Sequence, residues 1–159
     1  MTEVYKIIIG EYHELNNDII NNSDKYIYKN FEYKIHTIQS SNILFKCYIN
    51  IIYKNIKYEI ITYYNNLYPH NCPTKIQING INMIDIYNDI ISKNNDLFKK
   101  SLLSWFNNWT DQYSIRDIID EVIKIIEYKE LYIKRILLNK ITNKYTNEYL
   151  DYLHYYLIT

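Results

Sequence analysis

The apolar positions of residues 2–20 recur every three or four residues, which is the spacing of one face of an α-helix. These positions are Val4, Ile8, Tyr12, Leu15 and Ile19. We therefore predict a helix over residues 2–20, although Gly10 in its middle costs roughly 1 kcal/mol relative to alanine. The acidic side chains of Glu11, Glu14 and Asp18 share another side of this helix, which indicates a solvated row rather than an acid/base pair.

Between residues 31 and 62 the apolar positions recur every second residue instead, which is typical of half-buried β-strands. Three such runs are separated by short polar turns: Phe31, Tyr33, Ile35 and Thr37; then Ile43, Phe45, Cys47, Ile49 and Ile51; then Ile56, Tyr58, Ile60 and Thr62. A shorter fourth strand is predicted over residues 75–79, and Asn79-Gly80 ends it because both residues tolerate positive φ. The pattern predicts an antiparallel meander of four strands, with Cys47 in the core.

Helical spacing returns after Gly80. The segments predicted as helical are residues 82–91, 97–106, 115–126, 130–141 and 147–157. The most regular of them carries one apolar face, made by Ile115, Ile118, Ile119, Val122, Ile125 and Ile126. Ser114 and Asp117 have the spacing of a capping box at its start. A helix, four antiparallel strands and then helices indicate an α+β fold of two layers, with the C-terminal helices packed on one face of the sheet.

The length of 159 residues is that of one domain. We assign residues 1–129 to this domain and residues 130–159 to a C-terminal helical extension of it. The 18 basic and 18 acidic residues give a net charge of zero, so nucleic acid is not an expected partner. No apolar run approaches the ~20 residues that cross a bilayer and no signal peptide is visible, so we expect an intracellular protein without a membrane partner.

Metal and cofactor sites are not expected either. The two cysteines, Cys47 and Cys72, are too few for a disulfide framework and the wrong set for a zinc site, and the histidines are scattered. Gly10 and Gly80 are the only glycines, so the chain has no glycine-rich phosphate loop.

Isoleucine, asparagine, tyrosine and lysine dominate the composition, and alanine is absent. These residues share AT-rich codons, so the bias indicates an AT-rich genome such as that of a parasite or a large DNA virus. A location in a virion therefore stays open beside the intracellular one. The 20 tyrosines do not by themselves indicate a surface for stacking nucleic-acid bases.

Both prolines lie in one segment, Tyr68-Pro69-His70-Asn71-Cys72-Pro73, after the longest strand region. Proline fixes φ and lacks an N–H donor, so two prolines four residues apart end a strand and stiffen the loop that follows. Trp109 precedes the capped helix, with Tyr113, Ser114 and Ile115 at fixed spacing after it. On physical grounds alone the first segment is an ordinary strand-ending corner.

These two motifs, in this order of elements, resemble those of the ubiquitin-conjugating (E2) fold superfamily, which includes catalytically silent E2 variants and RWD domains. That family ends its meander with Tyr-Pro-x-x-Pro-Pro, and here Cys72 replaces the first proline of the final pair. The looser Tyr-Pro-x-x-x-Pro of RWD domains fits Tyr68, Pro69 and Pro73. The family's Trp-x-x-x-Leu-Thr-Ile corresponds to Trp109 followed by Tyr113, Ser114 and Ile115. The resemblance covers roughly residues 2–126.

The chain departs from the family where the chemistry of active enzymes resides. Active E2 enzymes carry His-Pro-Asn and then the catalytic cysteine after the fourth strand, but residues 79–98 contain neither. Thioester transfer needs a thiolate nucleophile, so the resemblance implies a protein without conjugating chemistry. Cys72, with His70 and Asn71 beside it, is the one low-ranking candidate for a catalytic residue.

Three functions stay open. The first is a non-catalytic E2-like module that binds ubiquitin, a ubiquitin-like protein, an active E2 or a ligase-like partner. The resemblance maps such a partner surface to His70, Asn71, Thr110, Asp111 and Gln112. The second is a structural or assembly protein, for example of a large DNA virus, that keeps the fold without any link to ubiquitin. The third is a divergent conjugating enzyme that uses Cys72.

Overall fold

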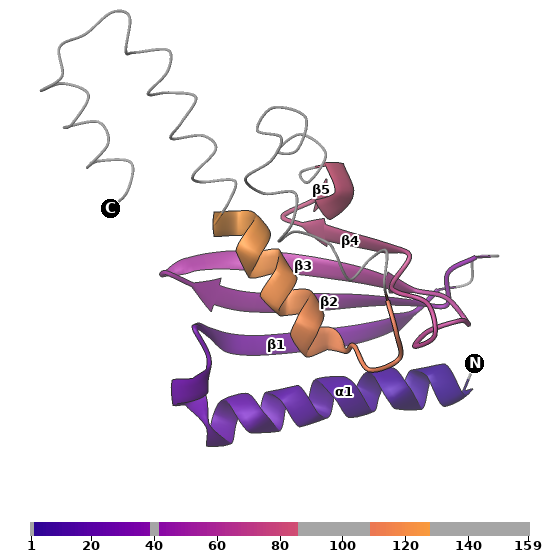
Figure 1. Cartoon of the computed structure of the whole chain (residues 1–159), viewed down its shortest axis with the longest axis horizontal. Coiled ribbons are helices and arrows are strands. Elements are labelled where there is room, and N and C mark those ends of the chain that lie inside the picture. The colour runs from indigo at the N-terminus through magenta and orange to yellow at the C-terminus, as the bar shows by residue number, and fades with distance from the viewer. Residues whose placement is uncertain (1, 39–41, 86–108, 128–159) are drawn as a thin grey trace, which may run out of the picture.

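The structure is a computed structural model that describes residues 2–38, 42–85 and 109–127. Helix α1 (Thr2–Asn21) and a 3₁₀ turn, η1 (Ser23–Lys25), precede a sheet of five antiparallel strands. The strands, which are neighbours in sequence order, are β1 (Tyr28–Thr37), β2 (Phe45–Tyr53), β3 (Ile56–Tyr64), β4 (Lys75–Ile78) and β5 (Ile81–Asn82). Residues 115–127 form a further helix, which crosses the sheet in Figure 1. The predicted α+β class and the N-terminal helix are confirmed.

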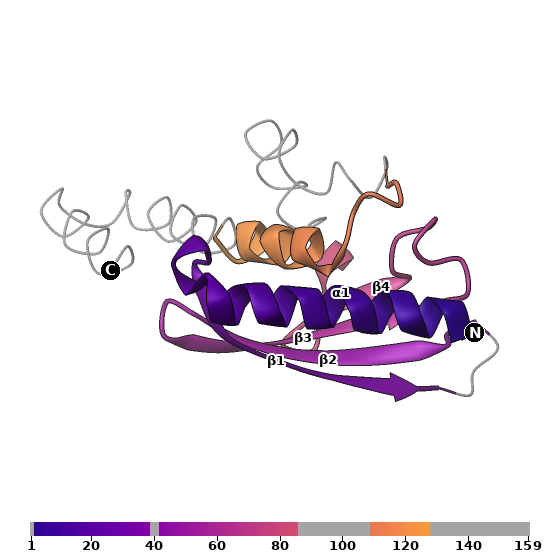
Figure 2. The same cartoon turned by 90° about the horizontal axis from the view of Figure 1, so that it is seen from below.

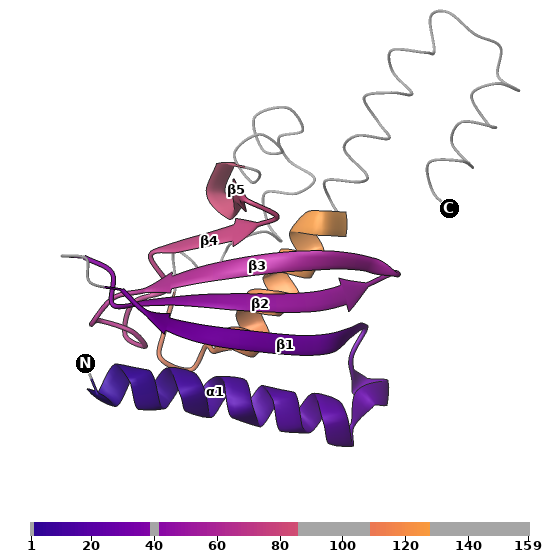
Figure 3. The same ribbon diagram turned by 180° about the vertical axis from the view of Figure 1, so that it is seen from behind.

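Both helices lie on the same face of the sheet (Figure 2). We call this the inner face; no described element lies over the opposite, outer face, which Figure 3 shows from behind. The predicted apolar stripe of α1 is buried against the inner face, with Val4, Ile8, Tyr12, Leu15 and Ile19 each at most 8% exposed. The apolar stripe of helix 115–127 is buried too, as predicted: Ile115, Ile118, Ile119, Val122, Ile125 and Ile126.

The predicted alternation is clearest in β2, whereas in β3 Ile56 is 49% exposed and Ile61 is buried between Ile60 and Thr62. Every second side chain of β2 is buried, and Cys47 is 0% exposed, as expected of a core residue. Lys54 and Asn55 both have positive φ and join β2 to β3 in a two-residue turn that pairs Tyr53 with Ile56. Positive φ at both central positions matches the right-handed twist of the flanking strands, so this turn holds the register.

An irregularity in β1 explains why its burial does not follow a simple period of two. The pairing with β2 shifts between Lys29 and Glu32, and Asn30 has a φ of 56°. A bulge inserts one extra residue, so side chains three positions apart can face the same side. Tyr28 and Phe31 are therefore both buried.

The prediction of four strands was wrong by one. Asn79 and Gly80 have φ values of 49° and 83°, so they form a tight hairpin instead of only ending β4, and Ile81 pairs back with Ile78. The predicted helix over 82–91 therefore starts one residue late. Asn82 belongs to β5, and its side-chain Oδ1 accepts a hydrogen bond from the Ile84 N–H, 3.1 Å away, at the start of the helical residues 83–85.

Several predicted segments lie outside the described residues. They are residues 86–91, the helices over 97–106, 130–141 and 147–157, and the proposed extension over 130–159.

Candidate functional site

The segment between β3 and β4, residues 65–74, carries the two prolines, and we call it the proline loop. Its backbone is fixed by its own hydrogen bonds: Asn71 N–H donates to the Leu67 carbonyl at 3.0 Å, and Thr74 N–H donates to the Tyr63 carbonyl at 2.8 Å. Pro73 is buried, and the Tyr68–Pro69 peptide bond is cis. Its backbone hydrogen bonds therefore hold the loop in a fixed conformation at the end of strands β3 and β4.

Residues 109–114, which we call the tryptophan loop, contact the proline loop directly. The indole Nε1–H of Trp109 donates a hydrogen bond of 2.7 Å to the carbonyl oxygen of Pro69. The Trp109 ring also lies 6.1 Å from that of Tyr68 and 5.3 Å from that of Tyr113. The two loops run side by side in Figures 1 and 2. Two motifs forty residues apart in sequence thus meet in one corner of the molecule.

The five residues that were predicted to bind a partner are all exposed on this corner. They are His70, Asn71, Thr110, Asp111 and Gln112. The tip of the tryptophan loop is a turn, in which Tyr113 N–H donates to the Thr110 carbonyl at 3.2 Å. Leu67, which the sequence pattern did not single out, is 50% exposed in the proline loop and adds an apolar side chain to the same corner.

Glu11 of α1 joins three elements beneath the corner. Its carboxylate accepts the Tyr68 hydroxyl, with O–O distances of 2.6 and 2.8 Å, and the Ile115 backbone N–H at 2.9 Å. Ile115 is the first residue of helix 115–127, whose unpaired N–H groups and macrodipole favour a negative charge. Glu11 therefore ties α1 to the proline loop and to the first residue of helix 115–127.

Burial raises the pKa of Glu11 from 4.5 to about 7, although the hydrogen bonds from Tyr68 and Ile115 lower it. The predicted solvated row is thus wrong for Glu11, whereas Glu14 is exposed as expected. Asp18 is also engaged: it accepts the Tyr26 hydroxyl and lies 3.3 Å from the Arg116 guanidinium. Glu11 lies three residues after Ile8 and four before Leu15, and this helical spacing could have placed it on the buried side.

Ser114 stands where the tryptophan loop becomes helix 115–127, as its motif predicted. Its backbone N–H donates to Asp117 Oδ2 at 2.9 Å, which is the return half of a capping box. The Ser114 carbonyl begins the helical ladder by accepting the N–H of Ile118 at 3.2 Å. This cap fixes the angle at which the loop leaves the helix.

Further buried tyrosines lie next to the corner, in the core. The rings of Tyr68 and Tyr64 pack edge to face, with centroids 4.6 Å apart. The Tyr12 hydroxyl lies 2.8 Å from that of Tyr64 and 2.9 Å from Thr62 Oγ1. Burial raises the pKa of the Tyr12 phenol well above its ordinary value, so these hydroxyls stay protonated and act only as hydrogen-bonding groups.

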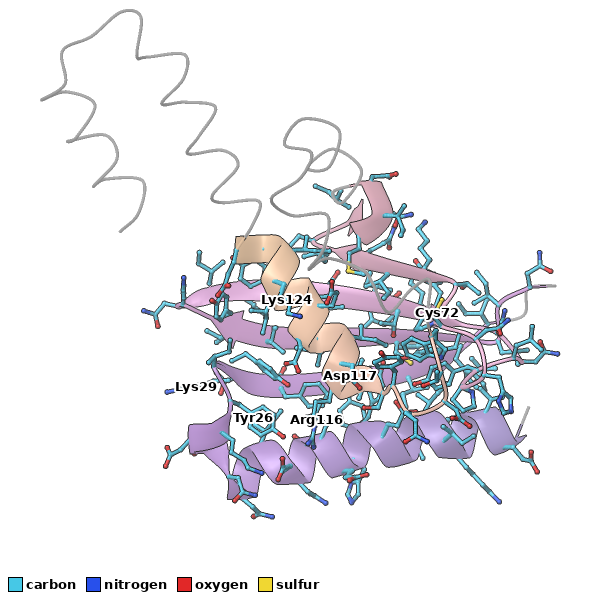
Figure 4. The ribbon with its side chains drawn as sticks, in the orientation of Figure 1. Tyr26, Lys29, Cys72, Arg116, Asp117 and Lys124 are labelled. Atoms are coloured by element: carbon cyan, nitrogen blue, oxygen red, sulfur yellow. The ribbon has the colours of Figure 1, made fainter. Side chains whose placement is uncertain are left out.

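Neither cysteine has the surroundings of a reactive thiol. Burial raises the pKa of Cys47 to about 12, and burial also raises the pKa of Cys72. A raised pKa lowers the thiolate fraction on which nucleophilic attack depends. Cys72 is half-buried against the core at the proline-loop end of the sheet, and Figure 4 shows the labelled Tyr26 at the opposite end of α1.

Within residues 2–38, 42–85 and 109–127, no three His, Cys, Asp or Glu side chains come together in a way that could hold a metal ion. None of the helices in these ranges is long and apolar enough to cross a membrane. Comparisons of the chain with protein-family models, with curated proteins and with solved structures find no match.

Proposed function

We propose that this chain is an E2-like protein-interaction module without conjugating chemistry, and that it binds a protein partner with the tips of the proline and tryptophan loops. The observation that carries the proposal is the hydrogen bond from Trp109 Nε1 to the Pro69 carbonyl. It joins the two segments on which the resemblance to the E2 fold rests.

The geometry favours binding because the exposed tips stand on a fixed base. Each loop has internal backbone hydrogen bonds, and Glu11 connects the proline loop and the start of helix 115–127 to α1. A preorganised surface loses little conformational entropy when a partner binds. Leu67 supplies exposed apolar area, and the two loops also expose polar side chains such as His70 and Gln112; a mixture of apolar and polar surface is usual in a transient interface.

The absence of conjugating chemistry rests on the placement of the thiols. Residues 79–98 contain no cysteine. Cys72 lies within the proline loop itself, where burial raises its pKa. A thiol at this position would be a poor nucleophile at neutral pH.

The binding test is an NMR titration of the isotope-labelled chain with ubiquitin and, separately, with an active E2. We expect shifts concentrated at residues 67–71 and 110–113, which His70→Ala and Gln112→Ala each weaken. Asp24→Ala, equally exposed at the opposite end of α1, is the matched control and should leave binding unchanged. If neither protein shifts any resonance at near-millimolar concentration, the link to ubiquitin is wrong.

A second assay tests the absence of chemistry. The chain is incubated with activating enzyme, ATP and ubiquitin, and the product is examined with and without reductant. We expect no adduct. A reducible adduct that disappears in Cys72→Ser would establish a divergent conjugating enzyme instead.

A further inference from the structure

The outer face of the sheet carries its charges in rows that follow the strand register. His36 of β1 pairs with Lys46 of β2, Lys46 pairs with Tyr63 of β3, and Tyr63 pairs with Lys75 of β4. We call these four residues the basic row. The ammonium group of Lys46 lies 5.4 Å from the centre of the Tyr63 ring, and that of Lys75 lies 5.6 Å from it, so the ring holds both cations in place.

An acidic row lies parallel to the basic row, four residues away along β2. Glu32 of β1 pairs with Asn50 of β2, and Asn50 pairs with Glu59 of β3. Both carboxylates are exposed. A rise of about 3.3 Å per residue separates the two rows by about 13 Å.

A middle row, which starts at Lys34 of β1, runs between them and includes an aromatic and an aliphatic side chain. Tyr48 of β2 pairs with Ile61 of β3, and Ile61 pairs with Gln77 of β4. Ile61 is only 8% exposed although it points outward. A hollow of about 370 Å³ opens beside Tyr48 and extends over His36, Asn50 and both acidic residues. No described element covers these rows, as Figures 2 and 3 show.

We propose that this face binds a second copy of the same chain, sheet against sheet, about a two-fold axis that runs along the middle row. Such an axis reverses the strand direction, so the basic row of each copy lies over the acidic row of the other. His36 then meets Glu32 of the second copy, and Lys46 and Lys75 lie on either side of its Glu59. An isologous pair makes each contact twice, so the pattern is complementary to itself. This inference does not depend on the proposed function, which uses another surface.

The same geometry also contains unfavourable charges. Lys29 of β1 and Lys57 of β3 pair with Ile52 of β2 and therefore lie on the outer face beside the acidic row, so this face carries more basic than acidic side chains. Lys34 of β1 pairs with Tyr48 and therefore lies at the β1 end of the middle row. In the dimer the two copies of Lys34 approach each other near the axis. The interface also has little apolar area, so we expect a transient dimer with a Kd of about 100 µM at low salt.

Charge reversal tests the proposal by sedimentation velocity, up to about 500 µM protein. One variant, Lys46→Glu with Lys75→Glu, makes the basic row acidic. The other, Glu32→Lys with Glu59→Lys, makes the acidic row basic. Each alone brings like charges together, and we expect each to weaken self-association at least about tenfold. All four residues lie on the half-buried or exposed outer face, and circular dichroism checks that each variant is folded.

The decisive measurement is the mixture of the two variants. In a mixed pair both contacts join opposite charges again, so an equimolar mixture should associate as well as the original chain or better. Lys34→Ser should tighten the dimer, and added salt should weaken it. The proposal is overturned if the original chain is monomeric at about 500 µM, if the variants leave its association unchanged, or if the mixture fails to associate.

Discussion

On the inner face of the sheet, the hydroxyl groups of Tyr12, Tyr64 and Tyr68 are buried and hydrogen-bonded to one another, to Thr62 or to Glu11. On the outer face, Tyr48 and Tyr63 remain half-exposed, and Lys46 lies against both rings. Tyrosine therefore has two different roles in this chain. An unpaired buried polar group is costly, and the hydroxyls of Tyr12, Tyr64 and Tyr68 avoid this cost, whereas that of the buried Tyr28 has no hydrogen-bond partner among the described residues. Outside, the ring positions a charge.

The contrast shows what a biased composition can hide. The tyrosines look like filler in the sequence, but in the structure Tyr12, Tyr64 and Tyr68 are buried hydrogen-bonding groups, whereas Tyr48 and Tyr63 lie against lysine on the surface. The inner set ends at the candidate binding corner, because Tyr68 connects to Glu11 and Trp109.

The two faces of the sheet should differ most in how much stability the protein loses when a tyrosine ring is truncated. Tyr12 is 0% exposed, so Tyr12→Ala leaves a cavity and should lower the free energy of unfolding by about 3–5 kcal/mol. The matched variant Tyr48→Ala removes a half-exposed ring and one cation–π contact, which should cost about 0.5–1 kcal/mol. Urea unfolding followed by circular dichroism measures both. Equal losses would mean that the outer face is packed as tightly as the core.

The second prediction concerns the pH dependence of stability. Burial raises the pKa of Glu11 from 4.5 to about 7, so the folded state binds this proton more tightly than the unfolded state. The stability that Glu11 contributes is therefore complete below about pH 4.5 and is lost as the pH rises through 7, a decline of about 2–3 kcal/mol. Glu11→Gln should remove this decline, when unfolding is measured from pH 4 to pH 8.

The control for Glu11 lies on the same helix. Glu14 is exposed, so Glu14→Gln should reproduce the pH profile of the original chain. Subtracting the Glu11→Gln profile from the original profile removes the contributions of other groups, including Asp18, whose pKa is lowered by its hydrogen bond from Tyr26. If the Glu11→Gln and original profiles run parallel, Glu11 is not desolvated in the folded protein.

Much of the fold could be predicted from periodicity alone, because burial follows the pattern of α1, β2 and helix 115–127 closely. The errors arose where backbone conformation depends on single residues. Positive φ at Asn79 and Gly80 makes a hairpin where the pattern indicated only an end, and positive φ at Asn30 breaks the period of β1. Asparagine and glycine at these positions permit such conformations without requiring them.

The candidate corner was less predictable than the fold. The motifs identified the exposed residues of both loops, but the Trp109–Pro69 bond joins positions forty residues apart, and no local pattern encodes such a contact. Glu11 was misjudged because a charged residue beside an apolar stripe is normally solvated. Its burial depends on donors from Tyr68 and Ile115, which only the tertiary structure brings to it.

The removal of one hydroxyl group, that of Tyr68, should change the free energy of unfolding least. Tyr68→Phe keeps the ring packing but removes the hydroxyl donor of Glu11, which should cost about 2 kcal/mol at pH 8 and about 1 kcal/mol at pH 5. The difference arises because the lost bond stabilises the charged carboxylate more than the protonated form, so the pKa of Glu11 rises further in the variant. Tyr48→Phe on the outer face should change stability by no more than about 0.5 kcal/mol at either pH. A loss in Tyr68→Phe that is the same at pH 5 and pH 8 would show that the hydroxyl does not act through Glu11.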